Sequence, residues 1–135
     1  MRVLIDTNAY AAFKRGDPET LDVLRMADEV HLSVIVLGEL LAGFAAGTQE
    51  PRNRRELAAF LDSPRVSVLP ATPATAGYYA AVFAQLRRKG RPIPTNDLWI
   101  AATTMEHGAM LLTHDRHFDE VDGLRVARQT ENLLP

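Results

Sequence analysis

Two acidic residues lie at the ends of short apolar segments. Asp6 directly follows the branched apolar run 3–5, and Asp115 comes shortly after the apolar run 109–113. Such runs are typical of strands that are buried on both faces of a parallel sheet. Because ligands of open α/β sheets bind beyond the carboxyl ends of the strands, we expect both carboxylates at the edge of the sheet where a site forms.

Two further acidic residues are expected to reach this edge from helices. Thr95 is a favourable N-cap, which places Asp97 in the first turn of the helix that follows. Glu39 lies on the predicted helix 35–47, which is apolar nearly all round, so we expect its carboxylate to have few routes to solvent. A glutamate buried without a partner is costly, and this cost favours a bound ligand beside Glu39.

Each of the four acids also has a purely structural interpretation. Asp6 could cap a helix, Glu39 could be a tolerated polar residue, Asp97 could complement the helix dipole, and Asp115 could form a turn. A shared pocket explains all four positions at once. Clustered carboxylates repel one another and take up protons unless a cation is present. Mg²⁺ or Mn²⁺ fits such a pocket, because both ions prefer carboxylate oxygen and water and bind substrate phosphates, and this indicates phosphoryl chemistry.

The composition is ordinary for a soluble globular protein and excludes several kinds of site. The chain has 135 residues, of which 47% are hydrophobic and 24% are charged, so one compact core is expected and membrane spanning is disfavoured. The absence of cysteine excludes disulfides, thiolate metal sites and a cysteine nucleophile. The N-terminus lacks the pattern of a signal peptide, and we therefore expect a cytoplasmic protein.

The charge pattern argues against a simple DNA-binding module. The net charge of −2 lacks the basic surplus that is usual in such domains. This charge is compatible with an enzyme that acts on nucleic acid, because metal-binding acids lower the net charge while basic side chains elsewhere meet phosphate. Two groups of basic residues, within 52–55 and 87–91, are either such contacts or solvated helix edges.

The apolar periodicity predicts strands that alternate with helices along the chain. Strands are predicted at 3–5, 30–34, 66–69, 109–113 and 124–126. Helices are predicted at 9–13, 17–28 and 35–47, and from residues 51, 73 and 95 onward. This alternation is typical of a parallel sheet with helices on both faces. We therefore predict an α/β fold, a single three-layer α/β/α domain over residues 1–135 with a central, mainly parallel sheet.

Four segments closely resemble the signature blocks of PIN-domain ribonucleases, and they come in the order of that family. The segments are Leu4-Ile5-Asp6-Thr7-Asn8, residues 33–40, residues 96–102 and residues 111–118. The small size of the chain resembles the VapC-type toxins of toxin–antitoxin pairs. The resemblance covers nearly the whole chain. It implies a PIN-like three-layer domain.

The resemblance also implies the roles of individual residues. Carried onto matching positions, it makes Asp6, Glu39, Asp97 and Asp115 the catalytic, metal-binding acids. It makes Thr7, Asn8, Asn96 and Thr113 residues that hold these acids or position the substrate. One departure concerns the start of the helix that carries Glu39, where the family often has Thr or Ser and this chain has Val36, so Ser33 could serve instead.

The activity that the resemblance implies is Mg²⁺-dependent endonucleolytic cleavage of RNA, with Mn²⁺ as a possible substitute. Metal-activated water would attack the phosphodiester and leave a 5′-phosphate and a 3′-hydroxyl. The family also implies a homodimer and a small VapB-type antitoxin whose tail covers the site, with an arginine directed at the acids.

Other interpretations stay open at the level of sequence. His114 and His117 flank Asp115, so a histidine-assisted or zinc-type site competes with phosphate contact and with simple exposure on a loop. Trp99 and the pair Tyr78-Tyr79 could stack on bases, but helical spacing among alanines favours a place in the core. Two alternative functions are a receiver-like domain with an acidic Mg²⁺ pocket and a catalytically silent PIN-fold module that binds RNA or protein.

Overall fold

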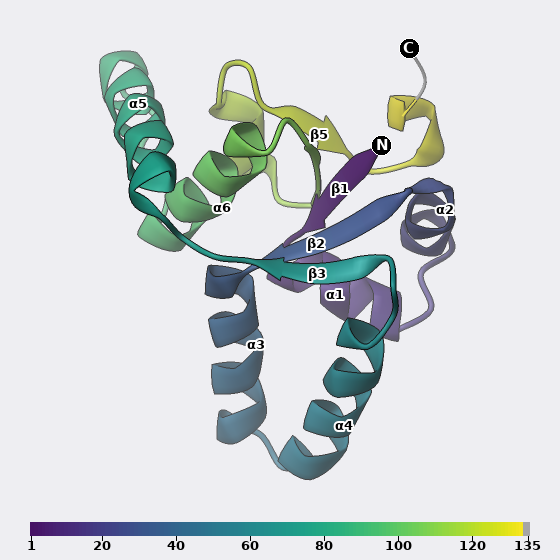
Figure 1. The fold of residues 1–135 in the computed structure, drawn as a ribbon. Coiled ribbons are helices and arrows are strands. Elements are labelled where there is room, and N and C mark those ends of the chain that lie inside the picture. The colour runs from purple at the N-terminus through teal and green to yellow at the C-terminus, as the bar shows by residue number, and fades with distance from the viewer. Residues whose placement is uncertain (134–135) are drawn as a thin grey trace.

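The computed structural model describes residues 1–133 and contains a five-stranded sheet in the order β3-β2-β1-β4-β5 (Figure 1). The strands are β1 (Arg2–Ile5), β2 (Glu29–Ser33), β3 (Val66–Leu69), β4 (Met110–Leu112) and β5 (Arg125–Ala127). All neighbouring strands pair in parallel. The predicted fold class is therefore confirmed, and the chain order reverses direction between β1 and β4.

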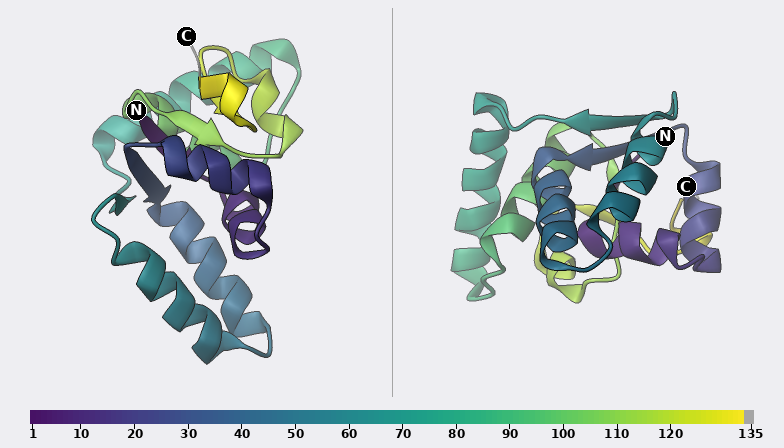
Figure 2. Two further views of the ribbon diagram at one scale, coloured as in Figure 1. Left: turned by 90° about the vertical axis from the view of Figure 1, so that its right-hand side faces the viewer. Right: turned by 90° about the horizontal axis from the view of Figure 1, so that it is seen from below.

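Within residues 1–133, six α-helices and one 3₁₀-helix connect the strands, and a second 3₁₀-helix follows β5. They are α1 (Thr7–Lys14), α2 (Pro18–Met26), α3 (Val34–Ala46), α4 (Glu50–Leu61), α5 (Pro73–Lys89), α6 (Thr95–Glu106), η1 (Arg116–Glu120) and η2 (Thr130–Leu133). Helices α5 and α6 pack together on one side of the sheet, and α1 and α2 lie on the other (Figures 1 and 2). Among residues 1–133, every helix is too short or too polar to cross a lipid bilayer.

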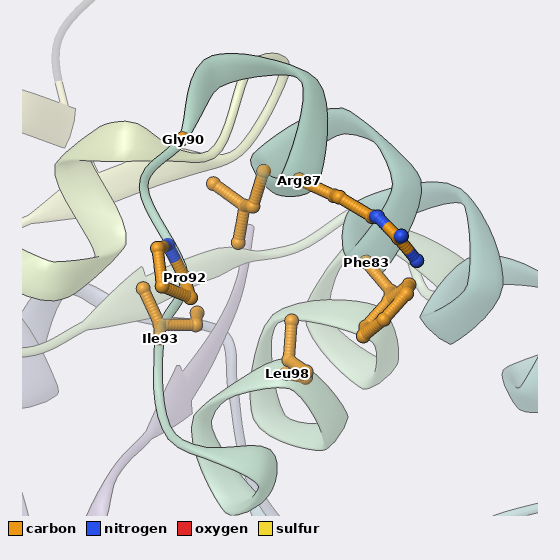
Figure 3. A pocket seen from close by; sticks show the side chains of 7 residues that line it. Phe83, Arg87, Gly90, Pro92, Ile93 and Leu98 are labelled. Atoms are coloured by element: carbon orange, nitrogen blue, oxygen red, sulfur yellow. The ribbon is translucent and has the colours of Figure 1, made fainter.

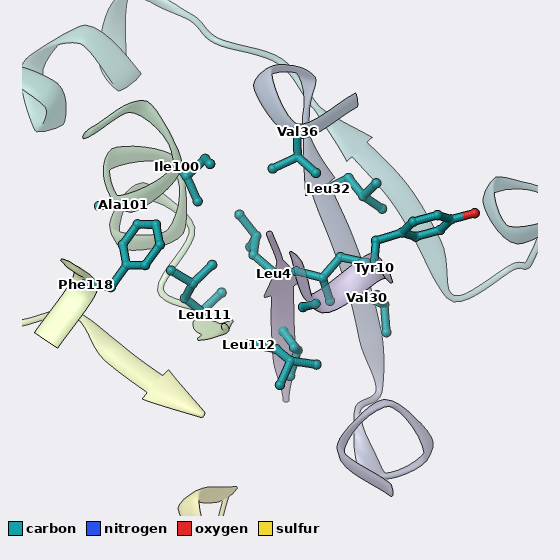
Figure 4. Packing of buried hydrophobic residues seen from close by; sticks show 14 of the residues in the cluster. Leu4, Tyr10, Val30, Leu32, Val36, Ile100, Ala101, Leu111, Leu112 and Phe118 are labelled. Atoms are coloured by element: carbon teal, nitrogen blue, oxygen red, sulfur yellow. The ribbon is translucent and has the colours of Figure 1, made fainter. Parts of the chain in front are cut away.

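The core forms where the central strands meet α6. Leu4 on β1 is in register with Leu111 on β4, and neither side chain is exposed. Ile100, Ala101 and Phe118 close over these leucines from α6 and η1 (Figure 4). Because burial of such a side chain is worth about 2 kcal/mol, this cluster fixes the position of α6 and of η1 against the ends of β1 and β4.

The capping residues at the helix ends agree in part with the sequence. Asp17 caps α2, since its carboxylate accepts from the Thr20 backbone N–H at 3.0 Å, and Pro18 is the first helical residue. The prediction that Thr95 caps α6 is wrong, because Pro94 occupies the cap position and Thr95 is already helical. Asp97 still lies in the first turn of α6, so its predicted placement is confirmed.

Two burial patterns differ from what the sequence predicts. The apolar spacing in α5 predicts that Val82, Phe83 and Leu86 share its inner face, but Phe83 is 46% exposed. Val82 and Leu86 are four residues apart and share one face, whereas Phe83 is turned about 100° away from Val82. The side chain of Glu39 is half-buried, so the expectation that its apolar helix shields it holds only in part. Helix α3 extends away from the sheet beside α4, and it buries only Val36 and Leu40 (Figure 1).

The aromatic residues of α5 and α6 mostly support packing between these two helices. The rings of Tyr79 and Trp99 have centroids 4.3 Å apart and are half-buried, and Tyr79 packs against the core, so the core interpretation holds in part for this pair. Tyr78, by contrast, is exposed, so the core interpretation does not hold for it.

Candidate active site

The four predicted acids line one cleft at the carboxyl end of the sheet. The cleft has a volume of about 160 Å³, and its lining residues are Asp6, Thr7, Asn8, Glu39, Asp97, Ile100 and Asp115. It lies beside the ends of β1 and β4, where the strand order reverses. Open α/β sheets bind their ligands at such a reversal point, because the loops from the two strands diverge there.

Asp6 is the most deeply placed of these acids. It ends β1, is 4% exposed, and caps α1 by accepting from the Ala9 backbone N–H at 2.7 Å. The hydroxyl of Thr113, at the end of β4, donates to the other carboxylate oxygen of Asp6. Burial raises the pKa of Asp6, the hydrogen bond from Thr113 opposes this rise, and the charges of Asp115 and Asp97 add to it. Asp6 therefore caps α1 and lines the cleft at the same time.

Glu39 reaches the cleft from α3 and is held by two side chains. The hydroxyl of Thr7 donates to Glu39 Oε1 at 2.7 Å, and the amide of Asn96 donates to Oε2 at 3.3 Å. Ser33 caps α3 by accepting from the Val36 backbone N–H at 3.1 Å. Ser33 therefore performs the capping at the start of this helix, where Val36 departs from the family pattern.

Asp97 and Asp115 approach each other from α6 and from the loop after β4. Burial raises the pKa of Asp97, a hydrogen bond with His117 lowers it, and the charge of Asp115 raises it further. Asp115 is anchored through its backbone, because its N–H donates to Thr113 Oγ1 at 3.0 Å and its carbonyl accepts from Arg128 at 3.3 Å. Thr113 thus connects Asp6 with Asp115.

The remaining predicted residues differ in their contacts. Asn8 lines the cleft and is exposed, and its side chain takes no part in the hydrogen bonds described for residues 1–133. His114 is also exposed, and its Nε2 lies 3.2 Å from the hydroxyl of Thr20. The two histidines therefore have different surroundings. Of the two, His117 is the one that faces the acids, and its Nδ1 lies 3.3 Å from Asp97 Oδ2.

Sequence reasoning did not find two neighbours of the cleft, Ile100 and Arg128. Ile100 forms an apolar wall, and its helical spacing from Asp97 could have indicated this. The contact of Arg128 with the backbone of Asp115 depends on how the chain returns through β5, and periodicity carries no signal for it.

A second hollow is chemically unlike the acidic cleft. It has a volume of about 220 Å³ and lies between the end of α5, the following loop and α6 (Figure 3). Its lining residues are Phe83, Leu86, Arg87, Gly90, Pro92, Ile93 and Leu98. Among the described residues, none of the predicted site residues lines it. The described lining of this hollow contains no carboxylate, in contrast to the acidic cleft.

The donor set of the cleft fits a divalent cation. Asp6, Glu39, Asp97 and Asp115 all line this cleft, and the described lining contains no lysine or arginine to neutralise their charges. Of the four, Asp97 and Asp115 place carboxylate oxygens within 4.8 Å of each other. Mg²⁺ and Mn²⁺ are bound in proteins mainly by such oxygens together with water. Burial raises the pKa of both Asp6 and Asp97, and the charge of Asp115 adds to each rise.

The fold and the cleft together define a class: three-layer α/β/α proteins with an acidic cleft at the carboxyl end of a parallel sheet. The PIN domain model matches residues 3–124, and the chain belongs to the PIN domain family. Because the chain belongs to this family, it is not a receiver-like domain. The four acids lie within the matched range.

Known relatives of similar length support the assignment. The chain is 32% identical over 121 residues to ribonuclease VapC5 of Mycobacterium tuberculosis, which covers 89% of this chain and 87% of that one. It is 30% identical over 128 residues to ribonuclease VapC4 of the same organism, across 93% and 95% of the two chains.

Solved structures with the same fold come from toxin–antitoxin complexes. VapBC2 from Rickettsia felis, bound to a DNA fragment from its promoter, gives a TM-score of 0.84 at 25% identity and covers 94% of this chain and 98% of that one. VapBC-1 from nontypeable Haemophilus influenzae gives a TM-score of 0.83 at 25% identity, with 94% and 97% coverage.

Proposed function

We propose that this protein is a Mg²⁺-dependent endoribonuclease and the toxin of a VapBC-type toxin–antitoxin pair. The observation that supports this most directly is the cleft in which Asp6, Glu39, Asp97 and Asp115 meet. The relatives named ribonuclease VapC support RNA as the substrate. Carboxylates clustered without a cationic side chain suit phosphodiester chemistry, in which the protein must hold a cation against an anionic substrate.

The chain's own residues have distinct parts in this proposal. Asp6, Glu39, Asp97 and Asp115 hold Mg²⁺ or Mn²⁺. The bound cation lowers the pKa of a coordinated water and neutralises charge on the scissile phosphate. Thr113 keeps Asp6 oriented, and Thr7 does the same for Glu39.

Asn96 and Asn8 complete the proposed site. Asn96 holds Glu39 through one amide proton, and its second amide proton is available for a substrate oxygen. Asn8 is exposed at the rim of the cleft, where its amide can contact RNA. With water as the nucleophile, the RNA 2′-hydroxyl takes no part, so the products carry a 5′-phosphate and a 3′-hydroxyl.

The partners and the location also belong to this proposal. The complexes with the same fold contain VapB as well as VapC, which supports a small VapB-type antitoxin as the regulator of this protein. We extend the proposal to a homodimer in the cytoplasm, on the basis of the family resemblance. Light scattering of the purified protein, with and without the antitoxin, measures both associations.

The test uses antitoxin-free protein and a mixed cellular RNA pool. The pool is incubated with and without Mg²⁺ or Mn²⁺, beside the variant Asp97→Asn, and the end groups of new fragments are determined. Asp62→Asn is the matched control, because Asp62 is an exposed acid at the end of α4, outside the cleft lining. Discrete fragments with 5′-phosphates that require metal and Asp97 support the proposal.

Two outcomes of this test count against the proposal. A folded, metal-binding protein that leaves every RNA in the pool intact favours the catalytically silent module. Cleavage that persists in Asp97→Asn at the rate of Asp62→Asn contradicts the assignment of the site.

A further inference from the structure

One histidine lies beside two of the acids that line the cleft. His117 Nδ1 lies 3.3 Å from Asp97 Oδ2 and 3.3 Å from Asp115 Oδ1. One ligand atom from each of these three residues lies within 4.8 Å of the other two. The ring nitrogen therefore faces the same small volume as the two carboxylates, and a single cation can contact all three.

The position of His117 is fixed by its neighbours along the chain. Its backbone N–H donates to Asp115 Oδ1 at 2.9 Å, which caps the short helix η1. The next residue, Phe118, is 1% exposed and packs in the core beside α6 (Figure 4). With Phe118 directed inward and Asp115 bonded to the backbone of η1, the histidine ring stays at the mouth of the cleft.

The neighbouring histidine provides a natural contrast. His114 Nε2 contacts the hydroxyl of Thr20 at 3.2 Å, on α2. Its ring is not part of the group formed by Asp97, Asp115 and His117. The two histidines are three residues apart and both exposed, yet one faces the carboxylates and the other faces a hydroxyl on a different helix.

We propose that His117 is a nitrogen ligand of the divalent cation, together with Asp97 and Asp115. This inference rests on the proposed metal site and adds to it a preference among metals. Imidazole nitrogen suits first-row transition metals, whereas Mg²⁺ takes oxygen ligands almost entirely. The ligand set of this cleft therefore favours Mn²⁺ over Mg²⁺ more strongly than four carboxylates alone would.

The test uses Mn²⁺ alone as the probe, without RNA. Electron spin-echo envelope modulation of the Mn²⁺-loaded protein detects nitrogen bound directly to the metal. We expect nitrogen modulation in the unaltered protein and in His114→Gln, and its loss in His117→Gln. We also expect the dissociation constant for Mn²⁺, measured by calorimetry, to rise on the order of 10-fold in His117→Gln, with a smaller change for Mg²⁺.

Several results would overturn the ligand role. Mn²⁺ that binds with oxygen coupling alone shows that His117 stays outside the coordination sphere. Nitrogen modulation that survives in His117→Gln comes from a different nitrogen and contradicts the ligand role of His117. Equal losses of Mn²⁺ and Mg²⁺ affinity in His117→Gln contradict the preference among metals.

The ligand role and the nuclease activity can fail separately. Oxygen-only coupling in a protein that cuts RNA leaves the proposed function intact and removes His117 from the ligand set. Nitrogen coupling in a protein that cuts no RNA leaves the ligand role intact and removes the proposed activity. A protein that binds no Mn²⁺ in the cleft overturns the ligand role.

Discussion

The two halves of the acidic cleft are built in different ways. The inner half consists of Asp6 and Thr113, which end adjacent parallel strands and are buried. The outer half consists of residues from helices and the loop after β4, all of them half-buried or exposed: Thr7, Glu39, Asn96, Asp97, Asp115 and His117. The sheet fixes the inner half directly, whereas the outer half is held mainly by hydrogen bonds between its own side chains.

This difference indicates how each half responds to change. In the inner half, the side chain of Asp6 is 4% exposed and that of Thr113 is fully buried, so water can replace little of the hydrogen bond between them. In the outer half, water can replace a lost partner at modest cost. Substitutions in the inner half should therefore affect stability and activity together, and those in the outer half should affect mainly activity.

The largest expected effect comes from removing the charge at the centre of the inner half. Asp6→Asn keeps the shape of the side chain and an oxygen that can accept from Ala9, but it removes a proposed metal ligand. We expect RNA cleavage to fall on the order of 10³-fold, since the cation supplies several kcal/mol of charge stabilisation. Cleavage rates of Asp6→Asn and of the control Asp62→Asn on one substrate measure this. A loss of less than about 10-fold would show that the inner half is not catalytic.

The next largest effect concerns the hydroxyl that connects the two inner strands. Thr113→Val removes the donor to Asp6 and the acceptor of the Asp115 backbone N–H while it keeps the volume. We expect the free energy of unfolding to fall by about 1–3 kcal/mol and cleavage to fall about 10- to 100-fold. Urea denaturation and cleavage assays of the same preparations measure both. Unchanged stability would contradict the dependence of the inner half on this bond.

The matching substitution in the outer half sharpens the comparison. Thr7→Val removes the hydroxyl that donates to Glu39, which keeps a second donor in Asn96 and partial access to water. We expect cleavage to fall on the order of 10-fold and the free energy of unfolding to change by less than about 1 kcal/mol. A loss of stability as large as that of Thr113→Val would show that the two halves do not differ in this respect.

The sequence predicts the inner half better than the outer half. Short apolar runs identify β1 and β4, and the sheet then places Asp6 and the residues after β4 at one edge because parallel strands share their direction. The PIN family match confirms the fold class that this reasoning predicts, while the catalytic roles of the acids and the single domain over 1–135 stay predictions. The positions of the two inner residues thus follow from the order and direction of the strands.

The outer half depends on how helices leave the sheet, and local patterns do not specify this. Glu39 is more open to solvent than the apolar sequence of α3 predicts, because α3 extends away from the sheet beside α4. His117 faces Asp97 because η1 curls back toward the start of α6, and its spacing from Asp115 gave no sign of which histidine would do so. These tertiary contacts could not be predicted from the sequence.

The smallest expected effect is on the pH dependence of stability in the metal-free protein. Burial raises the pKa of Asp6 in the folded state, so the folded protein holds this proton more firmly than the unfolded chain does. The contribution of Asp6 to stability is therefore fully present below the unfolded pKa and is lost as the pH rises through the folded pKa.

Substitution with asparagine removes this dependence. With metal chelated, we expect Asp6→Asn to gain stability relative to the unaltered protein between about pH 4 and pH 7, by an amount on the order of 1 kcal/mol. Asp97→Asn should behave in the same direction but more weakly, since Asp97 belongs to the outer half and its bond with His117 opposes the rise. Urea denaturation across this pH range measures both variants. A larger gain in the free energy of unfolding for Asp97→Asn than for Asp6→Asn would contradict the proposed difference between the two halves. It would mean that the carboxylate at the mouth of the cleft is more strongly desolvated than the one in the inner half.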